Sequence, residues 1–154
     1  VNKTSVYRRW PTREALVAAA LERALGELSP ELRDTGSLRG DLLSLAETIA
    51  EFMARPIGRA LTRAVFAEAV SPTISGDARR RLEERAGGPA VAMIQRALGR
   101  GEWRAGVDPA AVLSMLVGAL LHRAHLEGEA PTRPWIERVV DVLVDGCGAA
   151  KGAR

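Results

Sequence analysis

Apolar residues recur along most of this chain at spacings of three and four, which is the period of one face of an α-helix. The clearest stripe consists of Leu38, Leu42, Leu45, Ile49 and Phe52. Comparable patterns predict further helices over residues 1–10, 12–28, 57–70, 77–100, 110–121 and 133–147. The chain is therefore expected to be helical along most of its length.

Proline, glycine and short polar residues mark the expected helix ends. Thr12 is suited to cap the second helix, and Arg55-Pro56 separates two apolar stripes. Gly87-Gly88-Pro89 is expected to kink or divide the helix over residues 77–100. A turn containing Trp103 follows, and Asp108-Pro109 then forms an N-cap with proline at the first helical position.

The segment from Ala110 to Leu121 is apolar on nearly every side, interrupted only by Ser114 and Gly118. A helix without a polar face must be buried all round, either in a large core or between subunits. The valine-rich stretch 139–144 has the β-branched residues that favour strands. Because no other segment supplies a partner strand, we predict a helix there and an all-α fold.

Composition limits the class of protein. The chain has 154 residues, 47% of them hydrophobic and 27% charged, which suits one folded domain and excludes a disordered chain. Its single cysteine excludes an intramolecular disulfide and a cysteine-based zinc finger. We find no secretory signal, and the longest apolar run is judged too short to span a bilayer. A cytoplasmic protein without a membrane partner is expected.

Positive charge is concentrated at the beginning of the chain. The sequence has 22 basic and 19 acidic residues, yet residues 1–13 contain four basic residues and no acidic one. Such a block is typical of a surface that binds anions, most often nucleic acid. A solvated terminal tail would have the same composition, and charge alone does not separate the two interpretations.

The opening VNKTSVYRRWPTREALVAAAL resembles the end of the DNA-binding domain of TetR-type (tetracycline-repressor-like) transcriptional regulators. The resemblance rests on Tyr7, on Trp10 three residues later, and on the capped helix start Thr12-Arg13-Glu14-Ala15-Leu16. Towards the other end, ALGRGEW, VDPAAV and HLEGEAPT resemble a TetR-type C-terminal domain. The resemblance therefore covers both ends of the chain.

This resemblance implies a recognition helix that enters the major groove of DNA. Val6 and Trp10 are its expected inward anchors. The implied contacts to bases and phosphates are Lys3, Thr4, Ser5, Tyr7, Arg8, Arg9, Thr12 and Arg13. The alternative is a basic helix that is merely solvated.

The resemblance also implies a division into two domains. Residues 1–28 would be the C-terminal part of a helix-turn-helix domain, and residues 29–154 a helical regulatory domain. A TetR-type head has two helices before its recognition helix, and neither stands in this sequence. We therefore expect a shortened head.

The regulatory domain of this family binds a small molecule and forms a homodimer. Candidate ligand contacts are Phe52, Met53, Phe66, Met93, Trp103, Met115 and His122, which offer large, adaptable apolar surfaces and one polar group. Candidate dimer contacts on the last two helices are Leu116, Leu120, Trp135, Val139, Val142 and Leu143. In both cases the alternative is ordinary packing within one subunit.

Catalytic and metal sites are not expected. His122 and His125 could approach a metal with a nearby glutamate, but paired histidines near a helix end are more often surface or pocket groups. Asp141 and Asp145 suit a solvated stripe, and Cys147 lacks a histidine on its helix face. We expect no cofactor and no enzyme activity. The predicted function is a repressor released from its DNA operator by a small, largely apolar ligand; the alternative is a helical dimerisation or scaffolding module.

Overall fold

The computed structural model describes residues 7–28, 33–70 and 76–148. This part of the chain contains helices and no strand, with one isolated bridge between Trp103 and Gly148. The helices are α2 (Arg13–Leu28), α3 (Leu38–Ala54), α4 (Pro56–Val70), α5 (Gly76–Gly99), α6 (Pro109–Leu121) and α7 (Arg133–Cys147), and a π-helical segment, η1 (His122–Leu126), continues α6. The all-α prediction is confirmed, including the helix over the valine-rich stretch.

Side-chain caps explain where several helices begin. The Thr12 hydroxyl accepts a hydrogen bond from the amide of Ala15 at 3.1 Å, at the start of α2. The Asp108 carboxylate accepts one from the amide of Ala110 at 3.0 Å, so the predicted Asp-Pro start of α6 is confirmed. Each cap satisfies an amide that has no partner within its own helix.

Helix α5 is not divided at Gly87, Gly88 and Pro89, so of the two predicted outcomes, a kink or a division, the division is wrong. Proline removes one amide donor from the helix, and two glycines weaken it further. Beyond these residues, Ala90 and Met93 are buried in the core. Packing of this face holds the helix together where local preference alone would interrupt it.

The apolar helix near the C-terminus is longer than the sequence pattern indicated. Because η1 extends α6, the helical stretch Pro109–Leu126 has 18 residues and a mean hydropathy of 1.3, which meets the length and composition of a membrane span. The expectation that the apolar run is too short is therefore wrong on length. Core helices of soluble proteins meet the same criterion, so this stretch is weak evidence for a membrane.

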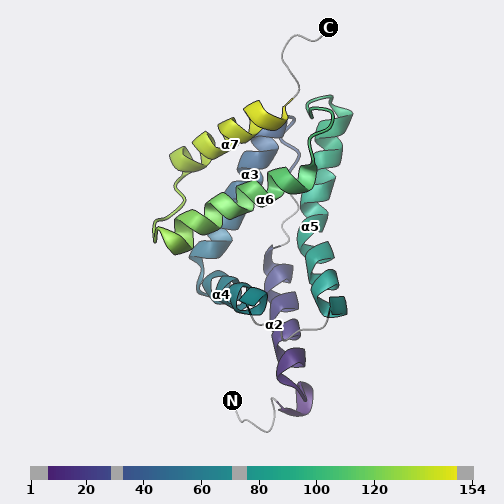
Figure 1. Cartoon of the computed structure of the whole chain (residues 1–154), viewed down its shortest axis with the longest axis vertical. Coiled ribbons are helices and arrows are strands. Elements are labelled where there is room, and N and C mark those ends of the chain that lie inside the picture. Colours follow the sequence, from purple (N-terminus) through teal and green to yellow (C-terminus); the bar gives the residue numbers. More distant parts are fainter. Residues whose placement is uncertain (1–6, 29–32, 71–75, 149–154) are drawn as a thin grey trace.

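Helix α3 is the centre of the arrangement, and α2, α4, α5, α6 and α7 all contact it. Figure 1 shows α6 crossing in front of α3, with α7 beside them and α5 along one edge. The most deeply buried large side chains come from four of these helices: Leu42, Met93, Leu116, Leu120, Ile136 and Val140. Helix α2 packs mainly against α5 and extends towards the N-terminal end of the molecule (Figure 1).

The corner between α3 and α4 depends on a glycine. Helix α3 ends at Ala54, and α4 begins at Pro56 after a single intervening residue. The first turn of α4 lies so close to the end of α3 that a Cβ atom added at Gly58 would overlap the carbonyl oxygen of Phe52. A backbone oxygen cannot move away as a flexible side chain can, so any larger residue must shift one helix.

We therefore expect Gly58→Ala to lower the free energy of unfolding by about 1–3 kcal/mol, the usual cost of overpacking. Gly87→Ala is the matched control, because nothing lies within 4 Å of a Cβ added there in α5. Alanine at that position is expected to raise stability by up to about 1 kcal/mol through helix preference. Urea unfolding followed by circular dichroism measures both changes, and equal signs for the two variants would contradict the explanation.

Candidate functional site

The described part of the basic segment, from residue 7 to residue 13, lies at the surface. Residues 7–9 are helical, and Tyr7, Arg8 and Arg9 are exposed. The Arg9 guanidinium lies 5.2 Å from the ring centroid of Trp10, which is half-buried. The side chains of residues 7–9 are therefore presented to solvent, as contact with DNA requires.

Arg13 continues this surface at the start of α2. Its side chain is exposed, as is that of Thr12, which caps the helix. The first amides of a helix and its dipole attract an anion such as a DNA phosphate. Lys3, Thr4 and Ser5 lie outside the described residues, so their predicted base contacts stay predictions.

The candidate ligand contacts fall into two groups. Phe52, Met53, Met93 and Trp103 are buried, and the last three belong to one core cluster. Met115 and His122 lie at the surface, and 55% of Met115 is exposed. The side chain of Phe66 is not among those described. The structure therefore places three of the seven candidates in the core but not at one point, because Trp103 follows Glu102 beside the first residue of α3 and Met53 lies near the end of that helix.

Trp103 is held firmly within this cluster. Its indole Nε1 donates to the carbonyl oxygen of Val107 at 3.0 Å, and its backbone pairs with Gly148 after α7. The next amide, that of Arg104, donates to the carbonyl oxygen of Cys147 at 2.7 Å. The turn between α5 and α6 is thereby fastened to the end of α7.

The candidate dimer contacts also divide. Leu116, Leu120 and Leu143 are buried within the subunit, where they form part of its core. Trp135 and Val139 are half-buried, and they pack against the same core from its edge. Val142 is 72% exposed and can meet a partner without any rearrangement.

Helix α6 presents a further apolar stripe that the dimer prediction missed. Ala111, Met115 and Gly118 are exposed at spacings of four and three, so they share one face. Only 17% of the stretch Pro109–Leu126 is buried within the subunit. Since α6 and α7 pack together, this stripe and Val142 lie on neighbouring helices that leave much apolar surface uncovered.

Potential catalytic groups have ordinary structural partners. Burial raises the pKa of the Cys147 thiol, and this effect outweighs the lowering by a backbone hydrogen bond and by the charge of Arg104. The thiol therefore stays protonated at neutral pH, and a protonated thiol is a poor nucleophile. Asp141 forms a 2.7 Å ion pair with Arg39 across α7 and α3. Among the described residues, no three metal-binding side chains come together.

The sequence interpretation missed one polar cluster altogether. Asp41 is a buried carboxylate in α3, and the guanidinium of Arg100 lies 2.8 Å from it. One signal was available, because Asp41 falls on the apolar stripe of Leu38, Leu42 and Leu45, where a charged residue is out of place. Nothing in the sequence identified Arg100 as its partner.

Comparison with known proteins gives concordant results. Residues 32–143 match the family described as "Tetracyclin repressor-like, C-terminal domain". The chain is 32% identical over 145 residues to the DNA-binding transcriptional repressor TetR of Mycobacteroides abscessus, covering 91% of this chain and 73% of that protein. It is 35% identical over 135 residues to the HTH-type transcriptional regulator AqdR of Rhodococcus erythropolis, covering 86% and 63%. An uncharacterised HTH-type regulator of Mycobacterium tuberculosis is 28% identical over 146 residues, covering 93% and 70%.

The chain has a helical body that follows exposed basic residues, and the relatives that it matches over most of its length are named as regulators. These findings define a transcriptional regulator that binds DNA. Such regulators are not enzymes. The chain belongs to the TetR family.

Proposed function

We propose that this protein is a homodimeric, cytoplasmic repressor that leaves its operator when a small, largely apolar ligand binds. The observation that carries the proposal is the combination of an exposed basic segment at the start of α2 with uncovered apolar surface on α6 and α7. Residues 1–28 then serve DNA binding, and residues 29–154 regulation. The name of the Mycobacteroides abscessus relative supports repression.

The proposed dimer is formed by α6 and α7 of two subunits. Met115, Val142 and the edges of Trp135 and Val139 supply apolar surface, and Gly118 allows a close approach of helices. A two-fold axis places two recognition segments on successive turns of DNA, which suits a palindromic operator. A scaffolding module that binds another protein would also use exposed apolar surface. That alternative gives the basic segment no role, so a DNA-binding dimer is the better explanation.

The proposed ligand site lies within the core, where Met53, Met93 and Trp103 are the buried candidate contacts. Methionines adapt to varied apolar shapes, and the indole provides a flat surface. A ligand accommodated there must displace part of the core, which moves α5 relative to α3. The affinity for the operator changes if the ligand-free and the ligand-bound arrangements of α5 and α3 bind DNA with different strength.

The DNA interface is tested by replacing Arg13 in the full-length protein. We expect Arg13→Ala to weaken binding similarly for all DNA sequences and to reduce the slope of log affinity against log salt by about 1, because one phosphate contact is lost. Fluorescence anisotropy with a selected operator and with random DNA, over a series of salt concentrations, measures both quantities.

Arg39→Ala is the control for this experiment. Arg39 is also an exposed arginine, but it lies on α3 and pairs with Asp141 of α7. We expect an unchanged slope. If the two variants lose affinity equally, net charge rather than a phosphate contact is responsible, and Arg13 has no place in the interface.

A further inference from the structure

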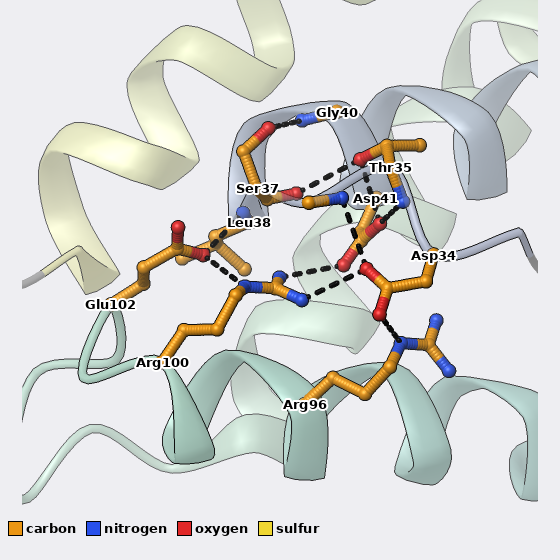
Figure 2. A network of polar contacts seen from close by, with 10 residues as sticks. Asp34, Thr35, Ser37, Leu38, Gly40, Asp41, Arg96, Arg100 and Glu102 are labelled. Carbon is orange, nitrogen blue, oxygen red and sulfur yellow. Dashed lines mark hydrogen bonds and ion pairs between the residues drawn. The ribbon is translucent and has the colours of Figure 1, made fainter.

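Arg100, just beyond the end of α5, joins three acidic side chains from separate parts of the chain. Figure 2 shows its guanidinium between Asp34, Asp41 and Glu102. The distances are 3.0 Å from Nη1 to Asp34, 2.8 Å from Nη2 to Asp41 and 3.1 Å from Nε to Glu102. All three nitrogens of one planar group are therefore engaged, which fixes its position and its orientation.

The acidic partners in turn hold the segment that leads into α3. The Asp41 carboxylate accepts hydrogen bonds from the amide of Thr35 at 2.8 Å and from its hydroxyl at 2.7 Å. Glu102 accepts one from the amide of Leu38 at 2.6 Å, the first residue of α3. Burial by itself raises the pKa of the Asp41 carboxyl, but the bonds from Thr35 and Arg100 outweigh it and the pKa lies below its usual range. Asp41 is consequently an anion in the folded protein at neutral pH.

Helix α5 connects this cluster with α2, because Arg100 follows the C-terminal end of α5 and α2 packs on the same helix. Helix α2 packs mainly on α5, and the segment beginning at residue 33 follows α2 before α3 starts. Among the described side chains of α5, Ala90, Met93 and Ala97 make apolar contacts with the core, and Arg96 adds a longer ion pair of 3.6 Å with Asp34. Apolar contacts have no directional requirement and permit sliding, whereas the forked arginine pairs do not.

A buried ion pair of this kind is weak evidence for stability, because desolvation of its charges opposes their attraction. Its better-attested use is to select one arrangement among several that pack comparably well. We propose that Arg100 is a positioning residue that fixes the angle between α2 and the regulatory body by tying the end of α5 to Asp34, Asp41 and Glu102. This rests on the proposed function, since it is α2 that bears the DNA-binding segment.

The test follows that angle in the full-length protein through the distance between one label on α2 and one on α3. Spin labels are placed at two exposed positions, Glu22→Cys on α2 and Glu51→Cys on α3, with buried Cys147 replaced by alanine. Dilution with unlabelled protein isolates the distance within one chain, which pulsed electron paramagnetic resonance reports as a distribution. The variant is the double substitution Asp41→Asn with Arg100→Met, which keeps an oxygen for Thr35 and leaves no buried charge at residue 41.

We expect the distance distribution of the double variant to become about twofold broader, because α2 gains access to further orientations. Arg39→Ala removes an exposed ion pair between α3 and α7 and serves as the control, with the parent distribution expected. Asp34→Asn, at a half-exposed carboxylate, is expected to give a smaller broadening even if the double variant does not fold. Parent-like distributions in Asp34→Asn and in a folded double variant overturn the proposal.

A second readout connects this angle to DNA. With operators whose half-site separation is varied one base pair at a time, we expect the double variant to lose about fivefold or more of the parent's preference for one spacing. The base preference within each half-site should stay unchanged. General destabilisation would instead weaken binding to every operator and would not change the spacing preference alone. If the parent protein binds no operator, the proposed function is contradicted. The role of Arg100 is still decided in that case, because the label distances are measured in the absence of DNA. An unchanged spacing preference in a folded double variant counts against the proposal.

Discussion

Val142→Asp is expected to separate the dimer into monomers. Val142 is 72% exposed on α7, which packs on α6, so a carboxylate there costs the isolated subunit little. In a dimer formed by α6 and α7, the same carboxylate is buried against apolar side chains without a partner. We expect dimerisation to weaken by about 100-fold or more, the range of a central interface residue. Sedimentation velocity at micromolar concentration measures the change.

Operator binding should fall together with dimerisation, because a monomer contacts one half-site only. The matched control is Val91→Asp, which makes the same substitution at a 54% exposed valine on α5. We expect that variant to stay dimeric and to bind DNA like the parent protein. A dimer that survives Val142→Asp would place the interface elsewhere, and dissociation by Val91→Asp would place α5 within it.

Trp103→Ala is expected to lower the free energy of unfolding by about 3–5 kcal/mol, the cost of removing a buried aromatic side chain. Trp103 is 7% exposed and belongs to the main core cluster. Its indole also donates to the carbonyl oxygen of Val107, within the turn that is fastened to the end of α7. Loss of this side chain therefore opens a cavity at the junction of α5, α6 and α7. Urea unfolding measures the cost.

Trp103→Phe separates packing from the hydrogen bond. Phenylalanine retains most of the apolar surface but leaves the Val107 carbonyl oxygen without its donor, for an expected loss of about 1–3 kcal/mol. If Trp103→Ala costs less than Trp103→Phe, or less than about 1 kcal/mol, the indole faces open space rather than packed core. That outcome would favour a preformed ligand cavity over one that opens when ligand enters.

Local features were predictable from the sequence. Stripes at spacings of three and four gave the helices, and the caps at Thr12 and Asp108 gave two of their starts, because capping involves residues only two or three apart in the chain. The exposed basic segment was also foreseen, since its residues are consecutive. That α5 continues through Gly87-Gly88-Pro89 is less predictable, because burial of the following residues in the core outweighs local helix preference.

Placement of side chains in space was less predictable. Leu116, Leu120 and Val142 were grouped as dimer contacts because all three lie on apolar helices, yet two of them are fully buried in the subunit and the third is exposed. A helix that is apolar on all sides carries no pattern to show which side meets its own core. Met115 was assigned to the ligand site for its residue type, and its position on the exposed stripe of α6 was decided by packing.

The all-α fold and the excess of positive charge at one end follow from the amino-acid sequence, and family-specific motifs at both ends of the chain indicate a TetR-type regulator. Each of these properties depends on residues close together in the chain. Two further properties depend on the packing of the helices in space: Arg100 meets Asp34 and Asp41, which lie some sixty residues away, and one face of α6 stays uncovered. Such contacts depend on how whole helices pack, and helical periodicity contains no information about the partner that a given face will meet.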